Sequence, residues 1–179
     1  MRAGDAGVPG AGTNRDLAGV PGEASGPDLS GVLVVGYGNA LRGDDALGWH
    51  AVARLAADPR LDGARVIWQH QLTPELALDM AGSSLVVLVD AESGIEPGAL
   101  SVRRLDRTAA GGAAMSHHVE PESLLVMARE LYGSTPDAWI VSVGVAGLEV
   151  GDALSPAVAA AIPAVVDAVA NLVLGRPDA

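Results

Sequence analysis

The sequence predicts an α/β fold, a three-layer α/β/α sandwich with a mostly parallel, twisted sheet of about five strands. Short, continuous apolar runs are typical of strands buried on both faces of a parallel sheet. Here such runs alternate along the chain with segments of helical periodicity. The chain has 179 residues, of which 49% are hydrophobic, enough for one core and not comfortably for two. We therefore expect a single domain over residues 31–176.

The first thirty residues differ from the rest of the chain in composition. Residues 1–30 are rich in Gly, Pro, Ala and Asp, and the tripeptide Val-Pro-Gly occurs at both Val8 and Val20. The segment shows neither strand nor helix periodicity, and it cannot bury enough apolar surface to offset the entropy lost on ordering. We expect it to form a disordered N-terminal arm.

Five segments are expected to be strands. The clearest are three continuous apolar runs, residues 32–36 (VLVVG), 84–90 (SLVVLVD) and 138–144 (AWIVSVG), each typical of a strand covered on both faces. Residues 65–68 form a shorter candidate. Residues 99–105 alternate more and carry two arginines, which predicts an edge strand.

Helices are predicted where apolar residues recur every three or four positions, in residues 44–57, 73–80, 121–132 and 155–174. Two of them open with an N-cap residue followed by proline at the first helical position, Thr73-Pro74 and Ser155-Pro156. The alternation of these helices with the strands predicts a parallel-dominated sheet covered on both faces.

Charge and composition exclude several classes of function. The net charge of −11 repels phosphate backbones and anionic lipid surfaces, so we expect neither a nucleic-acid partner nor a membrane. No apolar run reaches the ~18 residues that span a bilayer, and residues 1–30 lack the apolar core of a signal peptide. Because cysteine is absent, any metal must be held by oxygen and imidazole ligands. The simplest location is the cytoplasm.

Chemistry is expected at the carboxyl ends of the strands, where ligands bind in open α/β sheets. The first turn, Gly36 to Asp45, resembles a dinucleotide-binding fingerprint, but Leu41 occupies the position of its third glycine. No carboxylate for a ribose follows the second strand, which ends in Trp68-Gln69-His70. A nucleotide site is therefore disfavoured.

Three groups of polar residues could together bind a divalent cation. Asp44 and Asp45 follow the first strand, where acidic residues more often complement a helix dipole. Asp90 ends a buried strand, where a carboxylate is costly unless it is solvated, paired or metal-bound, although it could also cap a turn. The third group is the Ser116-His117-His118 segment. Two carboxylates and one imidazole would suit Ni²⁺, Zn²⁺ or Fe²⁺.

Further residues of the same edge are candidates for substrate binding. Gly38 serves the tight turn and allows the backbone to approach the site closely. Asn39 could orient a carboxylate or donate to an oxyanion, or serve only as a turn residue. Gln71 and Glu75 follow the second strand, near enough to the same edge to contact a substrate peptide.

The opening segment VLVVGYGNALRGDDALG resembles the signature of the hydrogenase maturation proteases, the C-terminal endopeptidases specific for nickel–iron hydrogenases. Further blocks follow in the order of that family: Thr73-Pro74-Glu75-Leu76, the LVVLVDA strand, the Ser-x-His of Ser116 to His118, the VGV of Val143 to Val145, and the segment Gly151 to Pro156. The resemblance covers residues 32–174, nearly the whole expected domain.

The resemblance implies an activity and its residues. It makes Asp45, Asp90 and His118 the metal ligands. His117 is a rival to His118, because the Ser-x-His pattern separates the two by only one position. Asp45 stands where the family often has glutamate. It also makes Asp45 and Asp90 the catalytic candidates. The metal would be Ni²⁺ supplied by the substrate, a hydrogenase large-subunit precursor whose C-terminal extension is cut off after nickel insertion.

Two chemistries and two other functions stay open. The family is classed as aspartic-type, in which a carboxylate acts as general base, but a metal could instead polarise the scissile carbonyl, and we favour this metal-assisted route. A metal-dependent hydrolase of small molecules would keep the same ligands. A non-catalytic chaperone that senses a metal centre would bind the precursor without cutting it.

Overall fold

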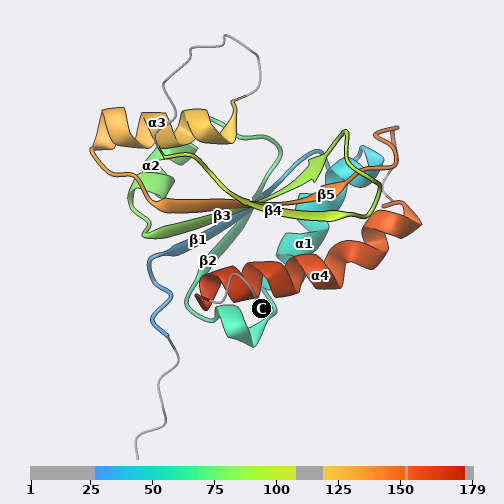
Figure 1. The fold of residues 1–179 in the computed structure, drawn as a ribbon, viewed down its shortest axis with the longest axis horizontal. Helices are drawn as coiled ribbons and strands as arrows, with labels where there is room; N and C mark the ends of the chain where they lie inside the picture. Colours follow the sequence, from blue (N-terminus) through green and yellow to red (C-terminus); the bar gives the residue numbers. More distant parts are fainter. Residues whose placement is uncertain (1–26, 108–118, 152, 176–179) are drawn as a thin grey trace, which may run out of the picture.

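The computed structural model describes residues 27–107, 119–151 and 153–175. In this part of the chain five strands form one sheet, in the order β2-β1-β3-β5-β4 (Figure 1). The strands are β1 (Val32–Tyr37), β2 (Arg65–Gln69), β3 (Leu85–Glu92), β4 (Leu100–Arg104) and β5 (Asp137–Gly144). All neighbouring pairs are parallel except β4 with β5, which is antiparallel. The predicted α/β fold and the edge position of β4 are confirmed.

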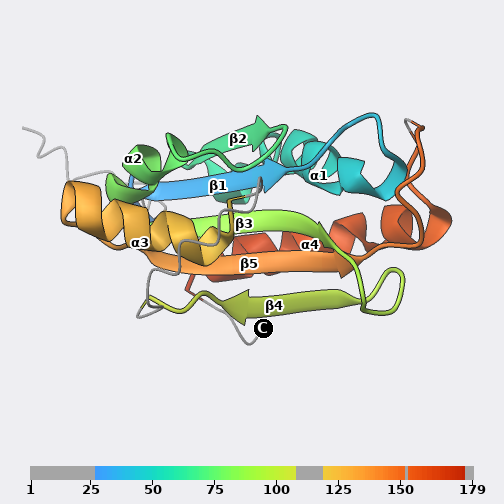
Figure 2. The ribbon, with the colours of Figure 1, turned by 90° about the horizontal axis from the view of Figure 1, so that it is seen from above.

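Helices cover both faces of the sheet and make three layers (Figures 1 and 2). The helices α1 (Leu47–Leu55) and α4 (Pro156–Val173) lie on one face, and α2 (Leu76–Ala81) and α3 (Pro121–Tyr132) lie on the other. Two 3-10 turns, η1 (Gly43–Ala46) and η2 (Pro59–Leu61), precede and follow α1. Each face has its own apolar cluster because successive strand residues point to opposite sides.

Strand residues divide between these two clusters by alternation. In β1, Val34 packs with α1 and α4, whereas Leu33 and Val35 pack with α2 and α3. The helix α4 is long and apolar enough to span a membrane by length and composition alone. Its buried residues, however, pack in the apolar cluster between the sheet and the α1–α4 layer, so it is a core helix. Ser155 caps it as predicted, accepting a hydrogen bond from the backbone N–H of Val158.

Three predicted boundaries were wrong. The helix expected from Asp44 begins at Leu47, after η1, because the Asp44 carboxylate binds a distant loop and does not cap the helix. The helix expected from Thr73 begins at Leu76, because the preceding backbone bonds close i→i+3 turns. The third strand does not end at Asp90 but runs on to Glu92, since β3 stays paired with β5 that far.

The predicted N-terminal arm falls mostly outside the described residues. Residues 27–30 are the exception, and there the structure differs from the prediction of disorder. Leu29 is buried in the apolar cluster on the α1–α4 face of the sheet. Its carbonyl accepts a hydrogen bond from the N–H of Val32. A single apolar side chain therefore extends the folded domain into a segment whose composition predicts none.

Gly48 allows α1 to lie directly against β1. A Cβ at Gly48 would overlap the backbone nitrogen and carbonyl oxygen of Tyr37, and one at Gly36 would overlap the carbonyl oxygen of Gly48. Gly48→Ala is expected to lower the free energy of unfolding by about 2–4 kcal/mol, because rigid backbone must move apart. Urea denaturation measures this. The matched control is Gly82→Ala, where the nearest atom would lie at 3.6 Å, so a loss of equal size there would contradict the explanation.

Candidate active site

The turn after β1 shapes one wall of a cavity. Gly38 has a φ of 127°, and a Cβ there would overlap the carbonyl oxygen of Asp45, so only glycine fits the turn. The N–H of Gly38 donates to the carbonyl of Gln69 at 3.2 Å. This hydrogen bond ties the turn to the end of β2.

The turn also holds the Asp45 carboxylate. The backbone N–H of Asn39 donates to Asp45 Oδ2 at 3.0 Å. The side-chain Oδ1 of Asn39 accepts from the N–H of Leu41 at 2.9 Å, so Asn39 acts as a turn residue through its side chain and positions a carboxylate through its backbone. Of the roles proposed for Asn39 from the sequence, the geometry supports the turn and, through the backbone N–H, the orientation of a carboxylate.

Asp90 faces the same cavity from β3. Its Oδ2 accepts a hydrogen bond from the Tyr37 hydroxyl at 2.7 Å, and its Oδ1 accepts one from the N–H of Ala91 at 2.8 Å. Burial, reinforced by the negative charges of Asp45 and Glu92, raises the pKa of Asp90 to about 6, although the two hydrogen bonds act in the opposite direction. Burial, followed by the charge of Asp90, raises the pKa of Tyr37, so the phenol remains a donor.

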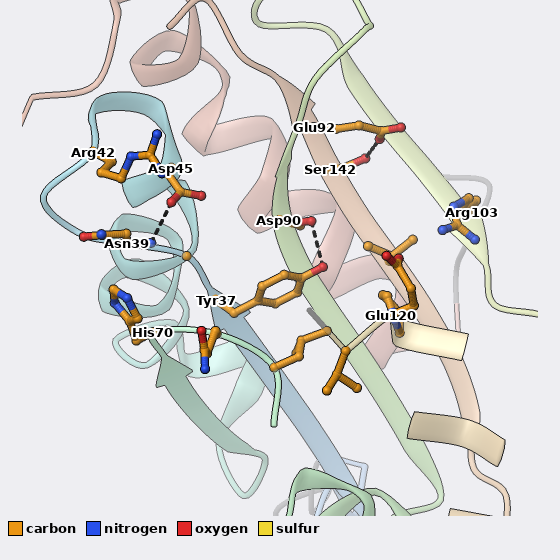
Figure 3. Close-up of a pocket in the computed structure, with 16 residues that line it drawn as sticks. Tyr37, Asn39, Arg42, Asp45, His70, Asp90, Glu92, Arg103, Glu120 and Ser142 are labelled. Atoms are coloured by element: carbon orange, nitrogen blue, oxygen red, sulfur yellow. Dashed lines mark hydrogen bonds between the residues drawn. The ribbon is translucent and has the colours of Figure 1, made fainter. Parts of the chain in front are cut away.

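The cavity has a volume of about 430 Å³ and opens on the α2–α3 side of the sheet, near the carboxyl ends of β1 and β3 (Figure 3). Besides Asp45 and Asp90, its lining includes three of the four residues proposed for substrate binding, Gly38, Asn39 and Gln71. The remaining lining residues are Tyr37, Arg42, His70, Leu72, Glu92, Arg103, Val119, Glu120, Pro121, Ile140 and Ser142. The sequence-based grouping of the two aspartates is thus reproduced in space.

Two other predicted site residues are not placed in this cavity. Glu75 is exposed at the N-cap of α2 and is not part of the lining. His118 and its rival His117 lie outside the described residues, so their role stays a prediction. Val119, the first described residue after them, does line the cavity.

Asp44, the neighbour of Asp45, has a different role. It is 1% exposed, and its two oxygens accept backbone hydrogen bonds from Ala146 at 2.8 Å, Gly147 at 3.3 Å and Ser155 at 2.7 Å. Burial alone would raise the pKa of Asp44, but these hydrogen bonds outweigh it and leave the pKa below its ordinary value. Asp44 therefore fastens the loop after β5 and the start of α4 to the turn that carries Asp45.

Several polar residues of the cavity were missed by the sequence analysis. Tyr37 is the last residue of β1, and its place at the carboxyl end of a strand is the signal that could have identified it. The Ser142 hydroxyl donates to the Glu92 carboxylate across β5 and β3, and only strand pairing reveals that contact. His70, which directly follows β2, also lines the cavity.

The described residues of the cavity offer only part of a ligand set for a divalent cation. Asp45, Asp90 and Glu92 supply carboxylate oxygens to one cavity, and their mutual repulsion contributes to the raised pKa of Asp90, which a cation would relieve. Within the described ranges, however, no three acidic or histidine side chains are grouped tightly enough to hold an ion. The described donors thus form an incomplete ligand set. The groups that already hold a metal in a substrate could supply the missing ligands.

Asp90→Asn is expected to stabilise the metal-free protein above pH 6. Because the pKa is raised to about 6 in the folded state, folding takes up protons at Asp90, and stability is lost as pH rises from the unfolded pKa toward 6. Asparagine carries no charge and so avoids this loss. We expect the free energy of unfolding to rise by about 2 kcal/mol at pH 8 and to change by close to zero at pH 3.5. Chemical denaturation in the presence of a chelator measures both, and an equal gain at the two pH values would contradict the assignment.

The chain matches no protein-family model and no curated protein. Among solved structures, a hydrogenase 2 maturation peptidase of Thaumarchaeota archaeon SCGC_AB-539-E09 is 30% identical over 81% of this chain and 98% of its own, with a TM-score of 0.62. The hydrogenase maturating endopeptidase HybD of E. coli is 26% identical over 77% and 88% of the two chains, with a TM-score of 0.64. The maturation protease HycI of Thermococcus kodakarensis, 23% identical over 82% and 93%, shares the fold at a TM-score of 0.60.

Proposed function

This chain belongs to the hydrogenase maturation protease family, and from that premise we propose that it removes the C-terminal extension of a nickel–iron hydrogenase large-subunit precursor after nickel insertion. The cut would activate the hydrogenase. The observation that carries the proposal is the meeting of Asp45 and Asp90 in one cavity of about 430 Å³. Such a cavity accommodates a few residues of an extended peptide, and its two carboxylates supply the groups that hydrolysis needs.

Substrate nickel is the expected metal in this reaction. Asp45 would contact it from η1 and Asp90 from β3, and His118 is proposed as the third ligand. These oxygen and imidazole groups suit Ni²⁺, and the chain has no cysteine to compete for it. When bound, the metal supplies Lewis-acid polarisation of a carbonyl.

The protein groups would handle the proton. The Asp90 carboxylate would act as the general base that takes a proton from an attacking water. The water oxygen bonds to the scissile carbonyl carbon, and the same proton then passes to the leaving amine as the C–N bond breaks. The Tyr37 hydroxyl holds Asp90 in place during the transfer. We favour this metal-assisted hydrolysis over a dyad of two carboxyls sharing one proton, because two carboxylates that contact a cation cannot also share a proton.

The location and partners follow from the same proposal. We propose the cytoplasm as the location of both this protein and its precursor. The net charge of −11 makes nucleic acids and anionic membranes unsuitable partners.

Intact-mass analysis of the cognate large-subunit precursor, nickel-loaded and nickel-free, tests the proposal. We expect loss of a C-terminal peptide from the nickel-loaded form alone. Cleavage of both forms would overturn the metal-assisted chemistry but keep the protease. Binding without cleavage would favour the sensing chaperone, and neither binding nor cleavage would favour the small-molecule hydrolase.

A further inference from the structure

Three exposed apolar side chains gather on two loops beside the cavity. They are Leu41, Leu148 and Val150, exposed to 67%, 37% and 91%, and we call them the apolar rim. Single apolar residues on a surface need no explanation, but a group of them next to a functional cavity marks an interaction site. The cavity lining itself is mostly polar, so the apolar rim is a distinct surface with its own chemistry.

The apolar rim is built on a preformed backbone. The N–H of Gly151 donates to the carbonyl of Leu41 at 3.0 Å, and the N–H of Gly43 donates to the carbonyl of Gly151 at 2.8 Å. The guanidinium Nε of Arg42 adds a hydrogen bond to the carbonyl of Leu148 at 3.3 Å. Figure 2 shows the two loops side by side beyond the carboxyl ends of β1 and β5. Because the loops are already joined, little conformational entropy is lost when a partner covers them.

The apolar rim is continuous with the cavity. Asn39 and Arg42 line the cavity, and Leu41 lies between them on the same turn. In Figure 3 the Arg42 side chain lies beside Asp45, at the edge of the cavity. A chain that enters the cavity past Arg42 would bring its flanking surface to Leu41, whose carbonyl is bonded to Gly151, the neighbour of Val150.

We propose that the apolar rim docks the folded body of the large-subunit precursor, through an apolar patch next to the segment to be cleaved. The inference rests on the proposed function and extends it from the cleaved segment to the surface that recognises the partner. A protein substrate brings such a flanking surface, whereas a small molecule held in the cavity would leave the rim uncovered. The three side chains of the rim cover less area than a standard protein–protein interface of about 1,600 Å². The rim therefore serves as the apolar centre of a wider interface, and most of the binding free energy is expected at such a centre.

The test compares a double variant with a matched control. Leu41→Ser/Val150→Ser removes two rim side chains that make no core contact. Leu131→Ser removes a side chain exposed to 68%. Leu131 lies near the C-terminal end of α3, whereas Pro121 at the N-terminal end lines the cavity. For cleavage of the nickel-loaded precursor, we expect the double variant to raise KM about tenfold or more and to leave kcat within about twofold. Leu131→Ser is expected to change neither, and all three proteins should melt at similar temperatures.

Other results would overturn the inference in recognisable ways. An unchanged KM in the double variant, or an equal rise in Leu131→Ser, would show that the rim does not dock the precursor while leaving the protease activity intact. A fall in kcat at constant KM would assign these loops to the cavity instead. If the unaltered protein binds the precursor without cutting it, the proposed function fails, and the dissociation constant of the double variant then decides the docking question. If it does not bind the precursor, both proposals fail.

Discussion

Asp45→Asn and Asp90→Asn are each expected to reduce cleavage of the nickel-loaded precursor at least about a hundredfold, the loss typical when a charged group that stabilises a transition state is removed. The two side chains face one cavity, Asp45 from η1 and Asp90 from β3. Asparagine keeps the size of each and preserves an acceptor oxygen, for the Asn39 N–H in one case and the Tyr37 hydroxyl in the other. The lost property is therefore charge and basicity. Single-turnover cleavage followed by intact mass measures the effect.

Glu75→Gln provides the matched control for these variants. It also removes one carboxylate from the region after the second strand, but the Glu75 side chain is exposed and does not line the cavity. Its cleavage rate is expected to stay within about twofold of the unaltered protein. Should Glu75→Gln be as inactive as Asp45→Asn, the cavity would not be the catalytic site. Full activity in Asp90→Asn would remove Asp90 from the mechanism.

Asp44→Ala is expected to be the most destabilising single substitution near the site, lowering the free energy of unfolding by about 3–5 kcal/mol. Three backbone N–H groups, of Ala146, Gly147 and Ser155, lose their acceptor, and each unpaired buried donor costs about 1–3 kcal/mol before the loop relaxes. Chemical denaturation measures the loss. Asp28→Ala is the control, since exposed Asp28 accepts a single backbone hydrogen bond, from Ser30.

Asp44→Asn separates the two parts of this effect. Asparagine retains one oxygen that can accept from Ser155 but turns an amide donor toward other donors, so an intermediate loss is expected. A loss below about 1 kcal/mol for Asp44→Ala would mean that water replaces the carboxylate and that the loop does not depend on it.

The sequence predicts the layers of this fold well and the roles of adjacent acidic residues poorly. Apolar runs such as residues 32–36 identify buried strands because burial on both faces leaves no other pattern. Asp44 and Asp45, by contrast, share one turn, and only the family resemblance, not their spacing, favours Asp45 as the one that faces the cavity. The difference is decided by Ala146 and Ser155, more than a hundred residues further on, whose N–H groups bind Asp44.

Contacts between strands explain the remaining differences. The phenol of Tyr37 matters because β1 lies beside β3 and brings it to Asp90. Glu92 and Ser142 meet because β3 and β5 pair in one register. Such partners depend on register, which a single sequence specifies only through its apolar alternation. His118 as a ligand stays a prediction.

The bonds between Asp44 and the loop after β5 have a consequence for the order in which the molecule is made. They join positions separated by 102 to 111 residues along the chain. On a ribosome, the first strand and its turn emerge long before Ser155 does, and domains form as their segments become available. The turn that carries Asp45 therefore gains its support only after the loop following β5 and the start of α4 have been synthesised. Proteolytic competence would then follow the formation of the sheet in the growing polypeptide.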